Sequence, residues 1–386
     1  SYRFKIRLVS GEERLLPEPE RSAFQAPAQD SFPQIAWVGK TIGYQIFPDR
    51  FYNGDPENDA LALATDEANF SPLAPDPILS AWNDPITPLH CCHQYFGGDL
   101  RGIREKLDYL AELGVGLIYL NPVFVSGSAH GYDTHDYLEV APRLGTKEEV
   151  RALLGEAHAR GMRVIFDFVP NHTGVGFWAF QDVVKRGPES PYWDWYFIRR
   201  WPFTPGDGTA YEGWWGLGSL PKLNTENPEV FQHLLDVALY WLEFGFDGMR
   251  IDVPNELRNA KEFFSRLRAE VKARNPEFYI VGEIWQIAPE WVRGEMFDSL
   301  MNYALGRDTL LRYAKGELTG EEALARLSRY YAAYGENVTA MGFNLVSSHD
   351  TSRILSDLGG GDLGDVPSAE SIARLKLLVT LLYTQP

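Results

Sequence analysis

Cysteine is almost absent from this 386-residue sequence, and the two that occur, Cys91 and Cys92, are adjacent. Neighbouring cysteines rarely reach good disulfide geometry, so a disulfide-stapled scaffold is excluded, and zinc ribbons and Cys-x-x-Cys redox sites lack their ligands. No apolar run approaches the roughly 18 residues that span a bilayer. The first ten residues alternate charged and apolar side chains, unlike a signal peptide. We therefore expect a cytoplasmic protein.

Positive charge is also scarce, since 36 Lys and Arg stand against 53 Asp and Glu and leave a net charge of −17. Such a surface repels phosphate backbones and anionic lipid, which argues against nucleic-acid and membrane partners. A neutral substrate fits this charge best. With 45% apolar residues, the chain has ample material for a large core.

The N-terminal segment differs from the rest of the chain. Apolar and charged side chains alternate from Tyr2 to Leu8, which predicts a strand with one buried face. A Pro/Glu/Gln-rich stretch over about 16–34 follows and is typical of a linker. Because a single strand is not a domain, we interpret residues 1–34 as the end of an N-terminal β-domain plus its linker.

From residue 35 onward, apolar strand-like runs alternate with amphipathic helical patterns. The runs predict strands at 42–47, 115–120, 163–169, 246–252, 278–283, 297–303 and 343–347. Helices are predicted at 101–113, 147–160, 228–244, 257–274, 320–335 and about 370–382. This alternation predicts an α/β fold in which helices wrap a parallel sheet.

Polar side chains follow nearly every predicted strand, namely Asp49, Asn121, Asp167, Asp252, Glu283 and Asp350. A TIM (β/α)8 barrel places its active site at this edge, and we favour that fold. A doubly wound open sheet is the alternative, but it usually carries a Gly-rich phosphate loop, and none is apparent. Seven strands are one short of a closed barrel, and the chain stops at Pro386 where the eighth should begin, so we predict a barrel that lacks strand 8.

A long connection follows the third predicted strand. It runs for roughly 60 residues, far beyond an ordinary loop, and is rich in Trp and Gly. We therefore predict a small subdomain inserted over 171–227, which divides the barrel into 35–170 and 228–386. Its Trp side chains are compatible with an ordinary core or with stacking on sugar rings.

Three acidic residues stand out because each follows an apolar strand: Asp252, Glu283 and Asp350. In a barrel, all three would project into one mouth. Cleavage of a glycosidic bond needs a carboxylate that attacks or stabilises the anomeric carbon and a carboxylic acid that protonates the leaving oxygen. Arg250 lies on the same strand face as Asp252, and we expect its charge to keep the pKa of Asp252 low.

Two histidines, His172 and His349, are candidate hydrogen-bond donors to sugar hydroxyls. Any one acid at a strand end more often caps a helix or joins an ion pair, and a single Arg or His on a strand is usually structural. The occurrence of three acids, one Arg and two His at corresponding strand ends favours a catalytic site.

Four motifs occur in order: DFVPNH (167–172), GMRIDVPNE (248–256), GEIW (282–285) and SSHD (347–350). With them the chain resembles glycoside hydrolase family 13, the α-amylase family. The segment LPKLN (220–224) resembles a motif of its neopullulanase, cyclomaltodextrinase and maltogenic amylase group.

The resemblance implies a retaining α-glucan hydrolase. It would cleave α-1,4, or also α-1,6, bonds in cyclomaltodextrins, pullulan or starch oligosaccharides through a covalent glycosyl-enzyme intermediate. The alternatives are a glucanotransferase or α-glucosidase of the same fold, or an inactive amylase-like binding subunit.

The same resemblance implies a role for individual residues. Asp252 is the nucleophile, Glu283 the general acid/base and Asp350 the transition-state stabiliser. Substrate contacts are implied for Tyr132, Asp133, His172, Arg250, Trp285 and His349.

The segment 53–59 offers several side-chain oxygens, the ligands that calcium prefers, although such a stretch is also typical of a solvated Asx-turn. FGGDLRGI (96–103) resembles the same group, whose calcium site joins both segments. The resemblance therefore implies a structural Ca2+ ion held by Asn53, Asp55, Asn58, Asp59, the backbone oxygen of Gly97 and Asp99. It also implies that only a full-length chain would form a homodimer.

Overall fold

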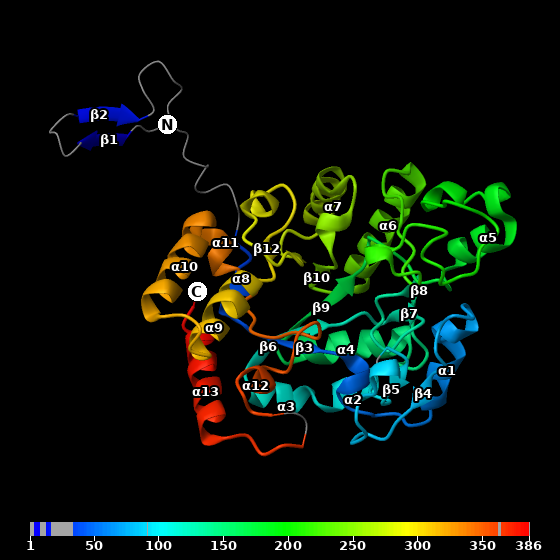
Figure 1. The fold of residues 1–386 in the computed structure, drawn as a ribbon, viewed down its shortest axis with the longest axis horizontal. Coiled ribbons are helices and arrows are strands. Elements are labelled where there is room, and N and C mark those ends of the chain that lie inside the picture. The colour runs from blue at the N-terminus through cyan, green and yellow to red at the C-terminus, as the bar shows by residue number, and fades with distance from the viewer. Residues whose placement is uncertain (1–3, 8–12, 17–33, 91, 362–363, 386) are drawn as a thin grey trace.

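Six parallel strands form one sheet at the centre of the structure (Figure 1). The computed structural model describes residues 4–7, 13–16, 34–90, 92–361 and 364–385, so Cys91 and the predicted linker at 17–33 lie outside it. The strand order is β12 (Ser299–Leu300), β11 (Tyr279–Gly282), β10 (Gly248–Ile251), β9 (Arg163–Phe168), β6 (Val115–Leu120) and β3 (Ile42–Ile46). Spatial order follows chain order, as in a partial (β/α)8 barrel.

Alternate residues of the central strands enter two different cores. On β6, Ile118 and Leu120 pack with the helices, whereas Leu117 and Tyr119 join a second cluster with Tyr279 of β11. Successive side chains of a strand point to opposite faces, so both faces of the sheet are buried. This burial explains why the strands read as almost continuous apolar runs.

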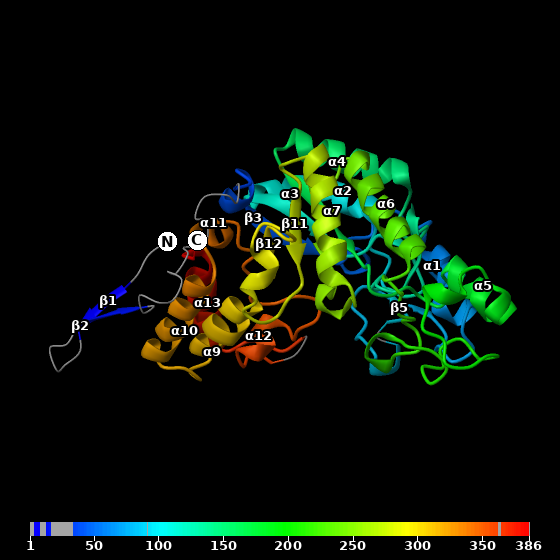
Figure 2. The ribbon, with the colours of Figure 1, turned by 90° about the horizontal axis from the view of Figure 1, so that it is seen from above.

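The predicted helices are present between the strands. They are α2 (Leu100–Glu105), α3 (Leu107–Glu112), α4 (Lys147–Ala159), α6 (Pro228–Phe244), α7 (Ala260–Arg274), α10 (Gly320–Ala333) and α13 (Ala369–Tyr383). Figure 2 shows α4, α6 and α7 along one side of the sheet. The helix predicted at 101–113 is interrupted at Lys106. Thr146 and Thr319 begin their helices with capping boxes.

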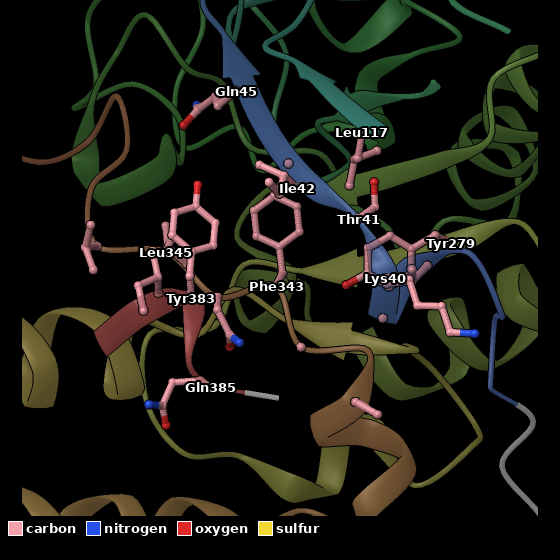
Figure 3. Close-up of a pocket in the computed structure, with 18 of the residues that line it drawn as sticks. Lys40, Thr41, Ile42, Gln45, Leu117, Tyr279, Phe343, Leu345, Tyr383 and Gln385 are labelled. Carbon is pink, nitrogen blue, oxygen red and sulfur yellow. The ribbon is translucent and has the colours of Figure 1, made fainter. Parts of the chain in front are cut away.

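The prediction of a seventh strand at 343–347 is wrong. Among the described residues this segment forms only one parallel bridge, between Met301 and Phe343. A pocket separates this segment from β3 on its other side, lined by Ile42, Phe343, Leu345 and Tyr383 (Figure 3). With a single bridge on one side and the pocket on the other, the segment 343–347 does not form a strand of the sheet.

The remaining segments are small. At the N-terminus, β1 (Phe4–Arg7) pairs antiparallel with β2 (Glu13–Leu16), so two strands form there and not one. Two further pairs are β4 (Ile78–Leu79) with β5 (Gln94–Tyr95) and β7 (Phe124–Ser126) with β8 (Thr134–Val140). The predicted insertion, 171–227, contains α5 (Trp178–Arg186) and isolated bridges such as His172 with Lys222. No helix in the described part of the chain has both the length and the apolar character needed to cross a membrane.

Candidate active site

The carboxyl ends of neighbouring strands bring the acidic residues together. Ile251 of β10 pairs with Gly282 of β11, and Asp252 and Glu283 are the next residues along the two chains. On the other side of β10, Arg250 pairs with Asp167 of β9. Parallel strands in register therefore place these four side chains at one edge of the sheet.

Arg250 is the centre of this cluster. Its side chain is fully buried, and Nη1 lies 2.8 Å from Asp167 Oδ1 and 2.9 Å from Asp252 Oδ1. Nη2 lies 2.9 Å from Glu283 Oε2. One guanidinium thus holds both predicted catalytic carboxylates, so the two lie within reach of the same small ligand group.

Three carboxylates share this one positive charge, and the imbalance affects their protonation. Burial raises the pKa of Asp252 well above its ordinary value, and the Arg250 charge opposes that shift only in part. Burial also raises the pKa of Asp167. The expectation that Arg250 keeps the pKa of Asp252 low is therefore wrong, because loss of hydration outweighs one shared cation.

Glu283 is fixed by donors on both oxygens. Oε2 accepts a hydrogen bond of 3.0 Å from the backbone N–H of Val253, and Oε1 accepts one of 3.2 Å from Trp285 Nε1. Val253 has a φ of 34°, a strained conformation for a β-branched residue, directly after Asp252. Trp285 stacks on Tyr303 with ring centroids 3.8 Å apart and is 42% exposed. The carboxyl is thereby held in position beside an accessible indole.

Tyr132 occupies the other side of the cluster. Its hydroxyl donates to Asp167 Oδ2 over 2.6 Å and accepts from Asn121 Nδ2 over 2.9 Å. Its ring faces the Arg250 guanidinium at 5.5 Å and stacks on His349 at 5.1 Å with an interplanar angle of 6°. The structure therefore places Tyr132 in the site, as the sequence predicts.

His349 and Asp350 extend the site. Gln45 Nε2 lies 2.7 Å from His349 Nδ1 and also donates to Asn121. An amide nitrogen is a donor, so His349 Nδ1 accepts and the ring proton is on Nε2. This Nε2 lies 3.2 Å from Asp350 Oδ2. Burial lowers the pKa of His349 to about 2, so the ring is neutral. Burial and the nearby Glu283 charge raise the pKa of Asp350 to about 6. Asp350 is 39% exposed, the most open of the three predicted catalytic acids.

His172 lies next to this group. Its Nδ1 is 3.1 Å from Asn171 Nδ2, which donates, so the proton of the neutral ring is on Nε2. Burial lowers the pKa of His172 to about 3. Nε2 is buried and has no hydrogen-bond partner in the described part of the chain, so a donor is available at this point.

Asp133 does not join the site, which corrects its predicted substrate contact. Its buried carboxylate accepts a hydrogen bond from Ser128 Oγ and interacts with the charges of His135 and His93. Tyr132 contacts Asp167 and Arg250, whereas Asp133 contacts Ser128, so the two neighbouring side chains face different parts of the molecule. Asp133 belongs to a separate buried polar cluster.

The predicted calcium ligands show a partial fit. Asn53 Oδ1 and Asn58 Oδ1 are buried and accept no hydrogen bond from any described residue. Burial raises the pKa of Asp59, and the negative charges of Asp99, Asp49 and Asp55 raise it further. A hydrogen bond from Asn53 opposes this rise in part. Asp99 caps α2 and accepts from the backbone N–H groups of Gly54, Asp55 and Gly102. No cluster of three or more His, Cys, Asp or Glu side chains positioned for a metal occurs in the described ranges.

The donor set nevertheless suits calcium. The two unpaired amide oxygens and the Asp59 carboxylate are hard oxygen donors, and Gly97 has a φ of 79° with no room for a side chain beside Asn53 and Asp59. The residues present therefore fit such an ion, with Asp99 fixing the loop through its backbone contacts.

Sequence reasoning missed several residues that build the site. Tyr119 donates to Asp167 Oδ2 over 2.5 Å, and Gln45 joins Asn121 to His349. The sequence indicates Asp167 as a strand-end residue and as the first residue of DFVPNH, but it does not indicate that Asp167 pairs with Arg250. The available signal was a polar side chain inside an apolar strand, as at Gln45 and Tyr119.

The fold and site together define an α/β protein of the barrel type, with a buried carboxylate cluster at the carboxyl ends of its strands. The family model described as "Alpha amylase, catalytic domain" matches residues 45–386. The chain belongs to the α-amylase family.

Named relatives and solved structures agree with this assignment. The chain is 41% identical over 356 residues to the maltogenic alpha-amylase of Bacillus acidopullulyticus (92% of this chain, 56% of the relative). It is 42% identical over 348 residues to neopullulanase 2 of Thermoactinomyces vulgaris (90% and 55%). The type III pullulan hydrolase from Thermococcus kodakarensis has a TM-score of 0.94 and 62% identity, with 100% of this chain and 68% of that chain covered. The chain thus spans a little over half the length of these two curated relatives.

Proposed function

We propose that the protein is a retaining α-glucan hydrolase that cleaves α-1,4, or also α-1,6, glucosidic bonds in cyclomaltodextrins, pullulan or starch oligosaccharides. The observation that carries the proposal is the contact of Arg250 with both Asp252 and Glu283. Relatives named maltogenic amylase, neopullulanase and cyclomaltodextrinase support the substrate class.

The proposed chemistry uses the two carboxyl groups in sequence. Asp252 attacks the anomeric carbon while Glu283 gives its proton to the leaving glycosidic oxygen, so one C–O bond forms as another breaks. Glu283 then takes a proton from water, whose oxygen displaces Asp252 and releases the sugar with retained configuration. Trp285 Nε1 holds the Oε1 oxygen of Glu283 in place for the first step.

The surrounding groups suit recognition of one neutral sugar. The neutral rings of His172 and His349 each carry a proton on Nε2, and His349 uses it to orient Asp350. The ionised Asp350 would stabilise positive charge that develops on the sugar. Tyr132 offers its ring beside the carboxylates.

The decisive experiment compares sugar release from β-cyclodextrin and pullulan by the wild type and Glu283→Gln. Glu290→Gln, an exposed acid in the segment after β11, is the matched control. We expect release by the wild type and the control and a loss of at least about a hundredfold in Glu283→Gln. Equal release by Glu283→Gln would remove Glu283 from its role. No release by any of the three would favour the inactive binding protein.

The proposal also includes a structural calcium ion held by Asn53, Asp55, Asn58, Asp59, Gly97 and Asp99. Bound there, it would neutralise the mutually repelling carboxylates and fix the loop after β3. We further propose a cytoplasmic location. Its support is a relative from Bacillus subtilis named intracellular maltogenic amylase, 39% identical over 328 residues.

A further inference from the structure

An exposed tryptophan lies at the edge of the inserted segment. The side chain of Trp215 is 79% exposed, the largest exposed fraction among the tryptophans that the structure describes. Its φ of 50° is in the left-handed region. In the described ranges, the one other non-glycine residue with positive φ is Val253, which holds Glu283. An indole this exposed gains little from burial, and a left-handed φ is strained for a residue with a Cβ, so burial alone does not explain a tryptophan at this position.

A stack of three rings joins Trp215 to His172. The Trp215 and Trp214 rings are 4.7 Å apart with an interplanar angle of 16°, and Trp214 lies 5.6 Å from the His172 ring at 23°. His172 follows β9 in the chain, five residues after Asp167, which is the ion-pair partner of Arg250. The stack therefore leads from the segment after β9 to the surface.

Two buried donors along this stack lack protein partners. His172 Nε2 and Trp214 Nε1 have no hydrogen-bond partner among the described residues. A buried N–H without an acceptor is costly, and sugar hydroxyls are suitable acceptors. The stack thus combines apolar ring faces with N–H donors, the combination that recognises a pyranose ring with its apolar faces and its rim of hydroxyls.

We propose that Trp215 is a stacking platform for a glucose unit outside the pair of sugars at the cleaved bond, and that it sets a preference for long or cyclic α-glucans over short ones. The inference rests on the proposed function, since it assigns a further sugar subsite to that same active site. The strained backbone presents the indole face to solvent, and the Trp214–His172 pair fixes its orientation.

The first experiment compares chain lengths. We expect Trp215→Ala to lower the ratio of kcat/KM for maltoheptaose to that for maltotriose by about fivefold to tenfold, through KM, because one aromatic contact is lost. Trp215→Phe should restore most of the ratio. Leu217→Ala, 47% exposed on the same turn, is the control and should leave the ratio unchanged. An unchanged ratio in Trp215→Ala, or an equal fall in Leu217→Ala, would overturn the proposal.

A second pair of measurements separates this inference from folding effects and from the proposed function. Trp215→Gly should keep or raise the unfolding temperature, because glycine accepts the positive φ, while the chain-length ratio falls as in Trp215→Ala. A fall in unfolding temperature with an unchanged ratio would assign Trp215 a purely structural role. If the wild type cleaves nothing, fluorescence titration with maltoheptaose still decides the inference: equal affinity of wild type and Trp215→Ala refutes it, and weaker binding by the variant supports it.

Discussion

Replacing Arg250 by methionine tests the electrostatic description of the site. The guanidinium is fully buried and contacts the carboxylates of Asp167, Asp252 and Glu283 at 2.8 to 2.9 Å. Methionine keeps much of the volume but removes the charge. Removing one partner of a buried ion pair costs about 3–5 kcal/mol, and here three carboxylates lose their cation at once.

The loss of stability in Arg250→Met should be larger at high pH than at low pH. Burial already raises the pKa of Asp252 and Asp167, and without Arg250 both should rise further. A carboxyl group whose pKa is higher in the folded state than in the unfolded state stabilises the folded protein at low pH. This stabilisation is complete below the pKa of the unfolded state and is lost as the pH rises through the pKa of the folded state. The variant should therefore lose about 4 kcal/mol at pH 7.5, near 5 °C in unfolding temperature, and clearly less at pH 5.

Urea unfolding at pH 7.5 and pH 5 measures the loss in free energy of unfolding and its dependence on pH. Arg266→Met is the control, since its side chain is 60% exposed and its ion pair with Glu270 should contribute under about 0.5 kcal/mol. Loss of kcat/KM by a factor of about 100 or more should accompany the Arg250 change. A midpoint shift no larger than that of Arg266→Met, or one independent of pH, would refute the reasoning.

Three further predictions follow from other sites. Burial raises the pKa of Glu67 to about 7, so this one group should contribute a loss of roughly 3 kcal/mol in wild-type stability as pH rises from 4.5 to 7. In urea unfolding, Glu67→Gln should show a smaller fall in stability over that range than the wild type by about this amount; an identical fall in both would contradict this. EDTA should lower the unfolding temperature and added Ca2+ should restore it, with a gain in stability of up to about 4 kcal/mol at a Ca2+ concentration 1,000 times its Kd. The double variant Asn53→Ala, Asp59→Ala should respond to neither addition, and a response equal to that of the wild type would contradict the proposed site. Because burial raises the pKa of Asp350 to about 6, wild-type kcat/KM should fall as the pH drops below that value. Asp350→Asn should be slow at every pH and should lack this acidic fall. An acidic fall that persists in the variant would show that another group causes it.

The sequence predicted the central strands and the Arg250–Asp252 pair well. Both depend on local patterns, namely apolar runs and the two-residue period that puts both side chains on one strand face. The strand at 343–347 was predicted by the same apolar pattern, but that pattern does not reveal whether a neighbouring strand is available on each side. The structure gives this segment a single bridge.

Other parts of the site depend on contacts between distant residues. Gln45 and His349 are 304 residues apart, and no local pattern indicates that they meet. The direction of a side chain in a loop is equally hidden, so Asp133 was grouped with Tyr132 although it points elsewhere. Burial of Asp252 likewise becomes visible only once the sheet and helices enclose it, and it reverses the pKa expected from Arg250 alone.

Covalent trapping tests the proposed role of Asp252 most directly. A slow glycosyl fluoride that forms a stable ester with the nucleophile would be incubated with the wild type, and the labelled peptide would be located by mass spectrometry. We predict that the peptide containing Asp252 gains the mass of one glycosyl group and that Asp252→Asn gains none. A label on the peptide with Glu283 or Asp350, or turnover of natural substrate with inverted configuration, would contradict the assignment of Asp252 as the attacking carboxylate.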